Sequence, residues 1–181
     1  MPVGAAIAKS LTCAFDVIPL IKIPIPWSPD ASYGVVVMDG TFALNKPLVR
    51  RLEPSEREIE MAIRMVLEEA RRRETLYRGT RPFPSLEGET IILTDDCIAS
   101  GYSMLAAAAF VKKRNTLAVV AAAPVASDIA SKMLSAEAGI NRLVTLSVDA
   151  EQFFSLSSHY KEFKSVSDDD VVSFLSVIKS W

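Results

Sequence analysis

The stretch that most constrains this 181-residue chain runs from Glu89 to Met104. It opens with the short apolar run Ile91-Ile92-Leu93, a pattern typical of a strand buried on both faces. Two adjacent carboxylates follow, Asp95 and Asp96, and then a turn of small residues. The Ala-rich segment after the turn predicts a helix over residues 102–113. A buried strand that leads into a helix in this way indicates an α/β domain with a mostly parallel sheet.

The turn after the two carboxylates has the chemistry of a sugar-phosphate site. The first backbone N–H groups of a helix have no partners within it, and the helix dipole favours an anion there. Gly101 allows close approach of a phosphate, and Ser100 and Ser103 add hydroxyl donors. A sugar attached to that phosphate would lie near Asp95 and Asp96, which can accept hydrogen bonds from its hydroxyls or hold Mg²⁺. The alternative is an ordinary strand–helix unit that ends in Asp, begins its helix with Ser or Gly, and binds nothing.

The rest of the chain predicts further elements of the same class. The Asp39-Gly40 pair indicates a hairpin turn, and Ser55 with Glu58 forms a capping box at the start of a long helix. We expect one α/β domain over residues 1–181, with a mostly parallel sheet flanked by helices. An antiparallel insert over residues 24–82 includes the long helix. The expected strands are 15–23, 33–38, 41–44, 116–123 and 142–146, and the other expected helices are 2–11, 128–138 and 171–178. Ser127 is the expected N-cap of the helix over residues 128–138.

Composition excludes several classes of function. The formal charge is only −2 and 23% of residues are charged, so no basic surface for nucleic acid is expected. Cys13 and Cys97 lie far apart, and the single His159 cannot form a histidine metal cluster. No apolar run has the length to span a bilayer, and residues 1–11 lack the basic start of a signal peptide. We expect a soluble cytoplasmic protein without a membrane partner.

The sequence around the carboxylates resembles the signature of type I phosphoribosyltransferases that binds 5-phosphoribosyl 1-pyrophosphate (PRPP). That signature is a hydrophobic strand, two acids, three residues, Thr-Gly and a second Ser or Thr, and Asp95, Asp96, Gly101 and Ser103 fit it. Ser100 replaces the usual Thr, Cys97 stands where Gly is common, and Tyr102 stands where a small residue is common. The resemblance is strongest to a branch of predicted phosphoribosyltransferases, through segments 39–40, 44–49, 72–79 and 163–168.

The resemblance implies a substrate and a reaction. The 5′-phosphate of PRPP would bind at Ala99, Ser100, Gly101, Tyr102 and Ser103, and the ribose at Asp95 and Asp96. These two carboxylates would be the catalytic residues and would hold Mg²⁺ indirectly. Lys22 fits the second member of a basic pair that reaches pyrophosphate in this family, and the alternative is a lysine that only ends its strand in solvent. Arg78 and Arg81 are further candidates from their position, because we expect them just beyond the long helix and just before the strand that leads to the site. Phosphoribose would pass to a nitrogenous acceptor that the sequence does not identify.

The sequence also departs from the family. Family members begin with another strand and an Arg-Gly-Gly loop that cradles pyrophosphate, and this sequence starts just after the equivalent point, so either its start lies upstream of Met1 or the loop is lost. They also place Gly where Pro24 and Trp27 stand here. A missing core strand leaves unpaired sheet edges, so we expect a homodimer or a rearranged sheet.

Two other functions stay open. One is a non-catalytic regulatory protein that binds PRPP or a nucleotide and lacks the pyrophosphate loop. The other is a receiver-like phosphorylation domain, which also has paired acids at a strand end. That domain needs a further Asp at a later strand end and then a Lys, whereas Asp128 opens a predicted helix and Lys132 lies within it.

Overall fold

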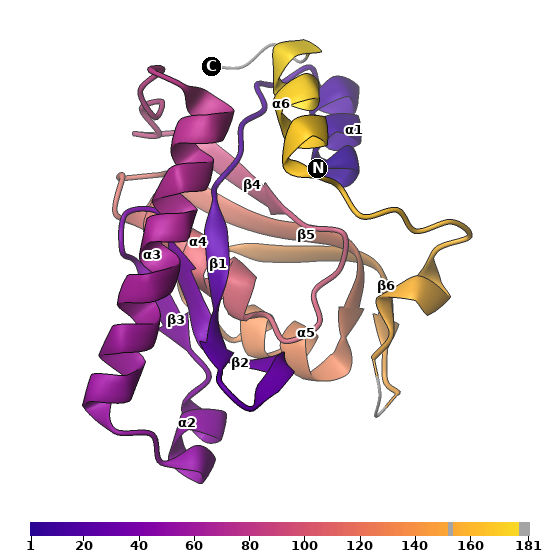
Figure 1. Cartoon of the computed structure of the whole chain (residues 1–181). Helices are drawn as coiled ribbons and strands as arrows, with labels where there is room; N and C mark the ends of the chain where they lie inside the picture. Colours follow the sequence, from indigo (N-terminus) through magenta and orange to yellow (C-terminus); the bar gives the residue numbers. More distant parts are fainter. Residues whose placement is uncertain (152–153, 178–181) are drawn as a thin grey trace.

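The computed structural model describes residues 1–151 and 154–177 and contains two sheets with helices around them (Figure 1). Its elements in chain order are α1 (Pro2–Leu11), β1 (Leu20–Ile25), β2 (Ser28–Val37), β3 (Phe42–Leu44), α2 (Lys46–Leu52), α3 (Glu56–Arg78), β4 (Thr90–Thr94), α4 (Tyr102–Lys112), β5 (Ala118–Ser127), α5 (Asp128–Ser135), β6 (Arg142–Asp149), the 3₁₀ turn η1 (Leu156–His159) and α6 (Asp168–Val177).

The first of these sheets is parallel and has the order β4-β5-β6. In its register Ile92 lies opposite Val120, and Ala122 lies opposite Val144. The strands alternate with α4 and α5, as the strand–helix pattern of the sequence predicts. Parallel strands joined by helices define the α/β class, so the predicted fold class is confirmed.

The second sheet is antiparallel and has the order β1-β2-β3. The predicted hairpin is present, because Val36 of β2 pairs with Phe42 of β3 across the turn at Asp39 and Gly40. The Asp39 carboxylate accepts a hydrogen bond of 2.8 Å from the Thr41 N–H and holds this turn. The outer face of the sheet packs on α2 and α3 through a separate apolar cluster that includes Ile23, Tyr33, Val36, Ile63 and Val66. The β2–β3 hairpin, α2 and α3 all fall within residues 24–82, the range expected for the insert.

The expected strand over residues 15–23 is wrong in extent and in pairing. The strand begins at Leu20, continues to Ile25, and pairs antiparallel with β2, so that Lys22 lies opposite Val35. Pro24 does not end it, because β1 is an edge strand and the register shifts at Pro24, where a missing N–H is tolerated. Lys22 therefore does not lie at the carboxyl end of a parallel strand.

The start of α3 is confirmed and its expected end is wrong. The Ser55 N–H donates to Glu58 Oε2 at 2.8 Å, and the Glu58 N–H donates to Ser55 Oγ at 3.3 Å, which completes the capping box. The helix continues through Arg78 and stops at Gly79, which has a φ of 59°. Arg78 thus belongs to the last turn of the helix instead of lying beyond it.

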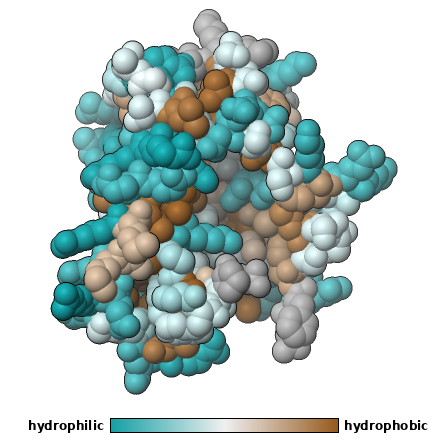
Figure 2. All heavy atoms as spheres, viewed as in Figure 1, coloured by the Kyte–Doolittle hydropathy of each residue, from teal (hydrophilic) through white to brown (hydrophobic). Residues whose placement is uncertain are grey.

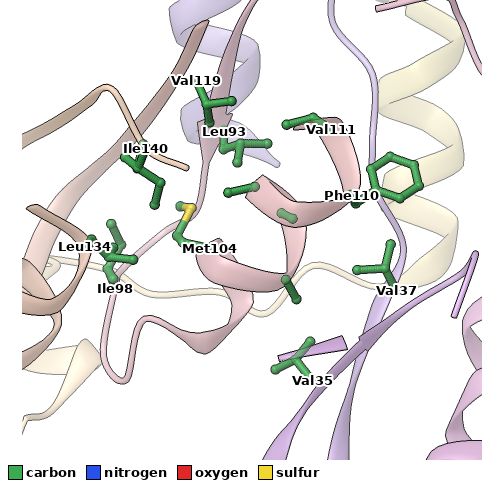
Figure 3. Packing of buried hydrophobic residues seen from close by; sticks show 14 of the residues in the cluster. Val35, Val37, Leu93, Ile98, Met104, Phe110, Val111, Val119, Leu134 and Ile140 are labelled. Atoms are coloured by element: carbon green, nitrogen blue, oxygen red, sulfur yellow. The ribbon is translucent and has the colours of Figure 1, made fainter. Parts of the chain in front are cut away.

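Helix α4 is the centre of the core and packs on both sheets. Its Phe110 and Val111 are fully buried, together with Val37 of β2 and Val119 of β5. Figure 3 shows Met104 of α4, Leu134 of α5 and Ile98 of the turn pointing into this same cluster. Because α4 contacts strands of both sheets, the helix is held between them.

Strand β4 has one unpaired edge. It pairs with β5 alone among the strands of the described residues, and all five of its residues line a cavity of about 650 Å³. Segment 13–18 and α1 form other walls of this cavity. Figure 2 shows apolar side chains beside a hollow over the region of β4 and β5. None of the helices within residues 1–151 and 154–177 combines the length and the hydrophobicity of a membrane-spanning segment.

Candidate functional site

The two predicted carboxylates lie directly after β4, at its carboxyl end. The Asp96 N–H donates to Asp95 Oδ1 at 2.9 Å, and the Asp95 N–H donates to the carbonyl of Ala122 in β5 at 3.3 Å. Burial, and then the negative charge of Asp96, raise the pKa of Asp95 to about 6. No ion pair to either carboxylate is found within residues 1–151 and 154–177. A bound cation or sugar hydroxyls would stabilise this pair.

The turn between the carboxylates and α4 is fastened to β5. The Ile98 N–H donates to the Val125 carbonyl at 2.9 Å, and the Ser127 N–H donates to the Ile98 carbonyl at 2.9 Å. These two bonds form an isolated parallel bridge between Ile98 and Ala126. Ala99 and Ser100, which follow it, are exposed. The turn is therefore anchored at its start and open to solvent in its middle.

Gly101 ends the turn in a conformation that favours glycine. Its φ of 80° lies in the left-handed region, and the residue is buried. A Cβ at this position would overlap Met133 Cε and would touch Ala130 Cβ at 3.5 Å. The absence of a side chain therefore allows α5 to pack directly behind the turn.

The N-terminus of α4 opens at this turn. Gly101 is its N-cap, and no side chain of the described residues caps it by a hydrogen bond. The amides of the first turn can therefore donate to an anion. Ser103 is half-buried beside them, and the Tyr102 hydroxyl donates to Asn45 Oδ1 at 3.2 Å, which ties the helix start to the insert.

Cys97 lies between the carboxylates and the turn and is a poor nucleophile. Burial, and then the charges of Asp96 and Asp95, raise the pKa of its thiol to about 12. No group of three or more potential metal ligands occurs in the part of the chain that the structure describes. Asp95 and Asp96 suit Mg²⁺ that arrives with phosphate ligands, because Mg²⁺ commonly uses one or two carboxylates and completes its shell with substrate oxygens and water.

The three cations expected at pyrophosphate are placed differently from one another. Lys22 is exposed on β1. Arg78 is buried, and its guanidinium donates to both oxygens of Asp16 at 2.8 and 2.9 Å and to the Val17 carbonyl at 3.2 Å. Arg81 donates to the carbonyls of Tyr77 and Arg78 at the end of α3, at 3.5 and 3.4 Å. The predicted residues from Asp95 to Ser103 form one continuous site. Arg78 instead stabilises the fold through its ion pair with Asp16.

The sequence did not predict a role at the site for three residues. The Tyr160 hydroxyl donates to the Asp96 carbonyl at 2.7 Å from the C-terminal segment, and no sequence pattern connects residues so far apart. Ser127 was expected only as a helix cap, yet its hydroxyl also donates to the Ala99 carbonyl at 2.6 Å. Asp16 was detectable, because it is a single carboxylate in an otherwise apolar run.

Comparison with known proteins identifies relatives of this chain. No family model matches the chain. Two curated relatives from Mycobacterium tuberculosis, strains CDC 1551 and H37Rv, are each named "Putative phosphoribosyl transferase" and are 30% identical over 175 residues. That match covers 97% of this chain and 39% of each relative, so the chain spans about two fifths of their length.

A solved structure provides the second comparison. The crystal structure of TT1426 from Thermus thermophilus superimposes with a TM-score of 0.73 at 30% sequence identity. The match covers 94% of this chain and 79% of that one. These likenesses show that the chain belongs to the same family as the relatives named "Putative phosphoribosyl transferase" and shares the fold of TT1426.

Proposed function

We propose that this protein binds PRPP with Mg²⁺ and transfers its phosphoribosyl group to a nitrogenous acceptor. One observation carries the proposal: an acidic pair at the end of β4 leads through a left-handed glycine into the uncapped N-terminus of α4. A sugar phosphate has the matching chemistry, since its anion suits the helix amides and its hydroxyls suit the carboxylates.

Each part of the site has a separate task in this proposal. The turn from Ala99 to Ser103 binds the 5′-phosphate, and Asp95 and Asp96 accept hydrogen bonds from the ribose hydroxyls. The raised pKa of Asp95 supports this placement, because a neighbouring cation or several hydroxyl donors would favour its charged form. Asp95 and Asp96 would also hold Mg²⁺, which supplies positive charge to the pyrophosphate leaving group.

The proposed reaction needs positioning more than covalent chemistry. The bond between ribose C1 and pyrophosphate breaks as a nitrogen nucleophile attacks C1 from the opposite face. The protein's contribution is to fix the sugar and to place charge beside the groups whose charge changes. A site built from a rigid turn, two carboxylates and helix amides suits that task.

Calorimetry tests the proposal directly. Wild type is titrated with PRPP in the presence of Mg²⁺, and so is the double variant Asp95→Asn/Asp96→Asn. The control is Glu56→Gln/Glu60→Gln, which removes two exposed carboxylates on α3 and so matches the change in net charge. We expect binding to wild type and to the control, and strongly reduced binding to the double variant. Unchanged heats in the double variant would remove the ribose assignment.

A non-catalytic PRPP-binding regulator is the second candidate, and the placement of Arg78 favours it. That guanidinium is buried against Asp16 and Val17, so one of the three expected pyrophosphate cations is committed to the fold. Measurement of pyrophosphate release in the presence of candidate nitrogenous acceptors separates the two functions. Binding of PRPP without any release of pyrophosphate selects the regulator.

The expected homodimer remains a proposal of its own. The unpaired edge of β4 supports it, as do the exposed apolar side chains of Val144, Leu146 and Val148 on β6. Sedimentation velocity over a range of protein concentrations tests it. A single species with the mass of one chain at all concentrations would contradict it.

A further inference from the structure

We infer that Ser127 is a positioning residue of the phosphate-binding turn. It orients the Ser100 N–H outward, where this group can donate a hydrogen bond to an anion. The inference rests on the proposed function for the nature of the ligand, and it assigns a role to a residue outside the signature. Ser127 ends β5 and caps α5, and only 8% of its surface is exposed.

The hydroxyl of Ser127 joins two elements. It donates to the Ala99 carbonyl at 2.6 Å and accepts from the Ala130 N–H at 3.0 Å. The backbone N–H of the same residue donates to the Ile98 carbonyl at 2.9 Å. Ser127 therefore holds two consecutive carbonyls of the turn, and its position is fixed in turn by the first turn of α5.

Fixing the Ala99 carbonyl also fixes the amide that follows it. In a trans peptide the carbonyl of one residue and the N–H of the next point in opposite directions. Because the Ala99 carbonyl points toward Ser127, the Ser100 N–H points away from β5 and α5. Ser100 is exposed, and its N–H has no acceptor among residues 1–151 and 154–177. It is thus presented on the open side of the turn.

The packing of α5 shows why a fixed anchor is needed at this place. Ala130, Met133 and Leu134 lie directly behind Gly101, so α5 forms the wall against which the turn rests. Ser127 is the N-cap of α5 and so lies at the start of this helix. Without its hydroxyl, the Ala99 carbonyl loses its partner, and the peptide between Ala99 and Ser100 is free to rotate.

The test separates loss of position from loss of stability. Ser127→Ala removes the bond to Ala99 and the cap of α5, whereas Ser127→Thr keeps a hydroxyl that can make both bonds. Ser55→Ala is the matched control, because it removes the N-cap of α3 and makes no contact with the turn. Affinities for ribose 5-phosphate and for PRPP with Mg²⁺ are measured by calorimetry at a temperature where all variants are folded.

We expect Ser127→Ala to bind ribose 5-phosphate about tenfold more weakly or worse, as for loss of a hydrogen bond to a charged group. Ser127→Thr should stay close to wild type, and Ser55→Ala should bind normally although it is less stable. Equal affinities of Ser127→Ala and wild type would overturn the inference, and so would equal losses in Ser127→Ala and Ser55→Ala.

A second measurement distinguishes this inference from the proposed function. Amide relaxation and hydrogen exchange at Ala99 and Ser100 are recorded by NMR without ligand. Wild type that binds neither compound would refute the proposed function and the anion role of Ser100 together. Increased motion of these amides in Ser127→Ala, absent in Ser127→Thr, would support the anchoring role. Unchanged motion in Ser127→Ala would overturn that role whatever the ligand.

Discussion

Replacing Gly101 by alanine tests whether the turn is held by packing as well as by backbone conformation. The left-handed conformation at φ 80° costs an alanine about 1–2 kcal/mol. The new methyl group also overlaps Met133 Cε, and overpacking of this kind costs about 1–3 kcal/mol. Because the end of a methionine side chain is flexible, the lower part of that range applies. We expect a total loss of about 2–4 kcal/mol in the free energy of unfolding.

Gly88 gives a matched control within the same chain. Its φ is 73°, and nothing lies within 4 Å of a Cβ at that position, so Gly88→Ala carries the conformational cost alone. The double variant Gly101→Ala/Met133→Ala removes the overlap, and its comparison with Met133→Ala alone isolates the conformational cost at residue 101. Urea denaturation of the variants at one pH gives the free energies of unfolding, and thermal midpoints should follow at about 2–4 °C per kcal/mol. Equal costs for Gly101→Ala and Gly88→Ala, with no coupling between residues 101 and 133, would refute the packing argument.

Two further outcomes follow from buried charges. Asp16→Ala leaves the Arg78 guanidinium buried without its carboxylate, so the free energy of unfolding should fall by about 3–5 kcal/mol. Asp16→Leu/Arg78→Met should recover most of that loss, because it replaces the whole ion pair with apolar side chains. Urea denaturation measures both variants, and additive costs would argue against a coupled pair. Asp95 has a pKa of about 6 in the folded protein and of about 3.8 in the unfolded chain. Its contribution to the free energy of unfolding is therefore present below pH 3.8 and is lost as the pH rises to about 6. The loss should reach about 3 kcal/mol. Asp95→Asn should abolish this part of the pH dependence of the unfolding free energy, and an identical pH profile in wild type and variant would contradict the raised pKa.

Local signals in the sequence predicted the parts of the fold that depend on nearby residues. The capping box at Ser55 and Glu58, the turn at Asp39-Gly40 and the cap at Ser127 all occur where the sequence places them. In each case the interaction is made within a few residues, so composition and spacing contain the necessary information. The strand, acidic pair, turn and helix from Thr90 to Lys112 were predicted for the same reason.

The features that the sequence did not predict depend on contacts between residues far apart in the sequence. The apolar run around Leu20 suits either a parallel or an antiparallel strand, and only its pairing with β2 decides between them. Arg78 reads as an available cation, because the sequence does not show that Asp16 lies beside it. Tyr160 reaches the Asp96 carbonyl from a segment with no recognisable pattern. The residues around a site are therefore harder to predict than its signature.

The signature residues alone do not account for a rigid site. The carboxylates, the turn and the helix start are held from three directions: Ser127 fixes the Ala99 carbonyl, Asn45 accepts from the Tyr102 hydroxyl, and Tyr160 donates to the Asp96 carbonyl. These partners come from β5, from the insert and from the C-terminal segment, which are far apart in the sequence. Movement of the insert away from the turn has to break the bond between Asn45 and Tyr102. Since Tyr102 is the first residue of α4, the insert is coupled directly to the amides that would bind the phosphate.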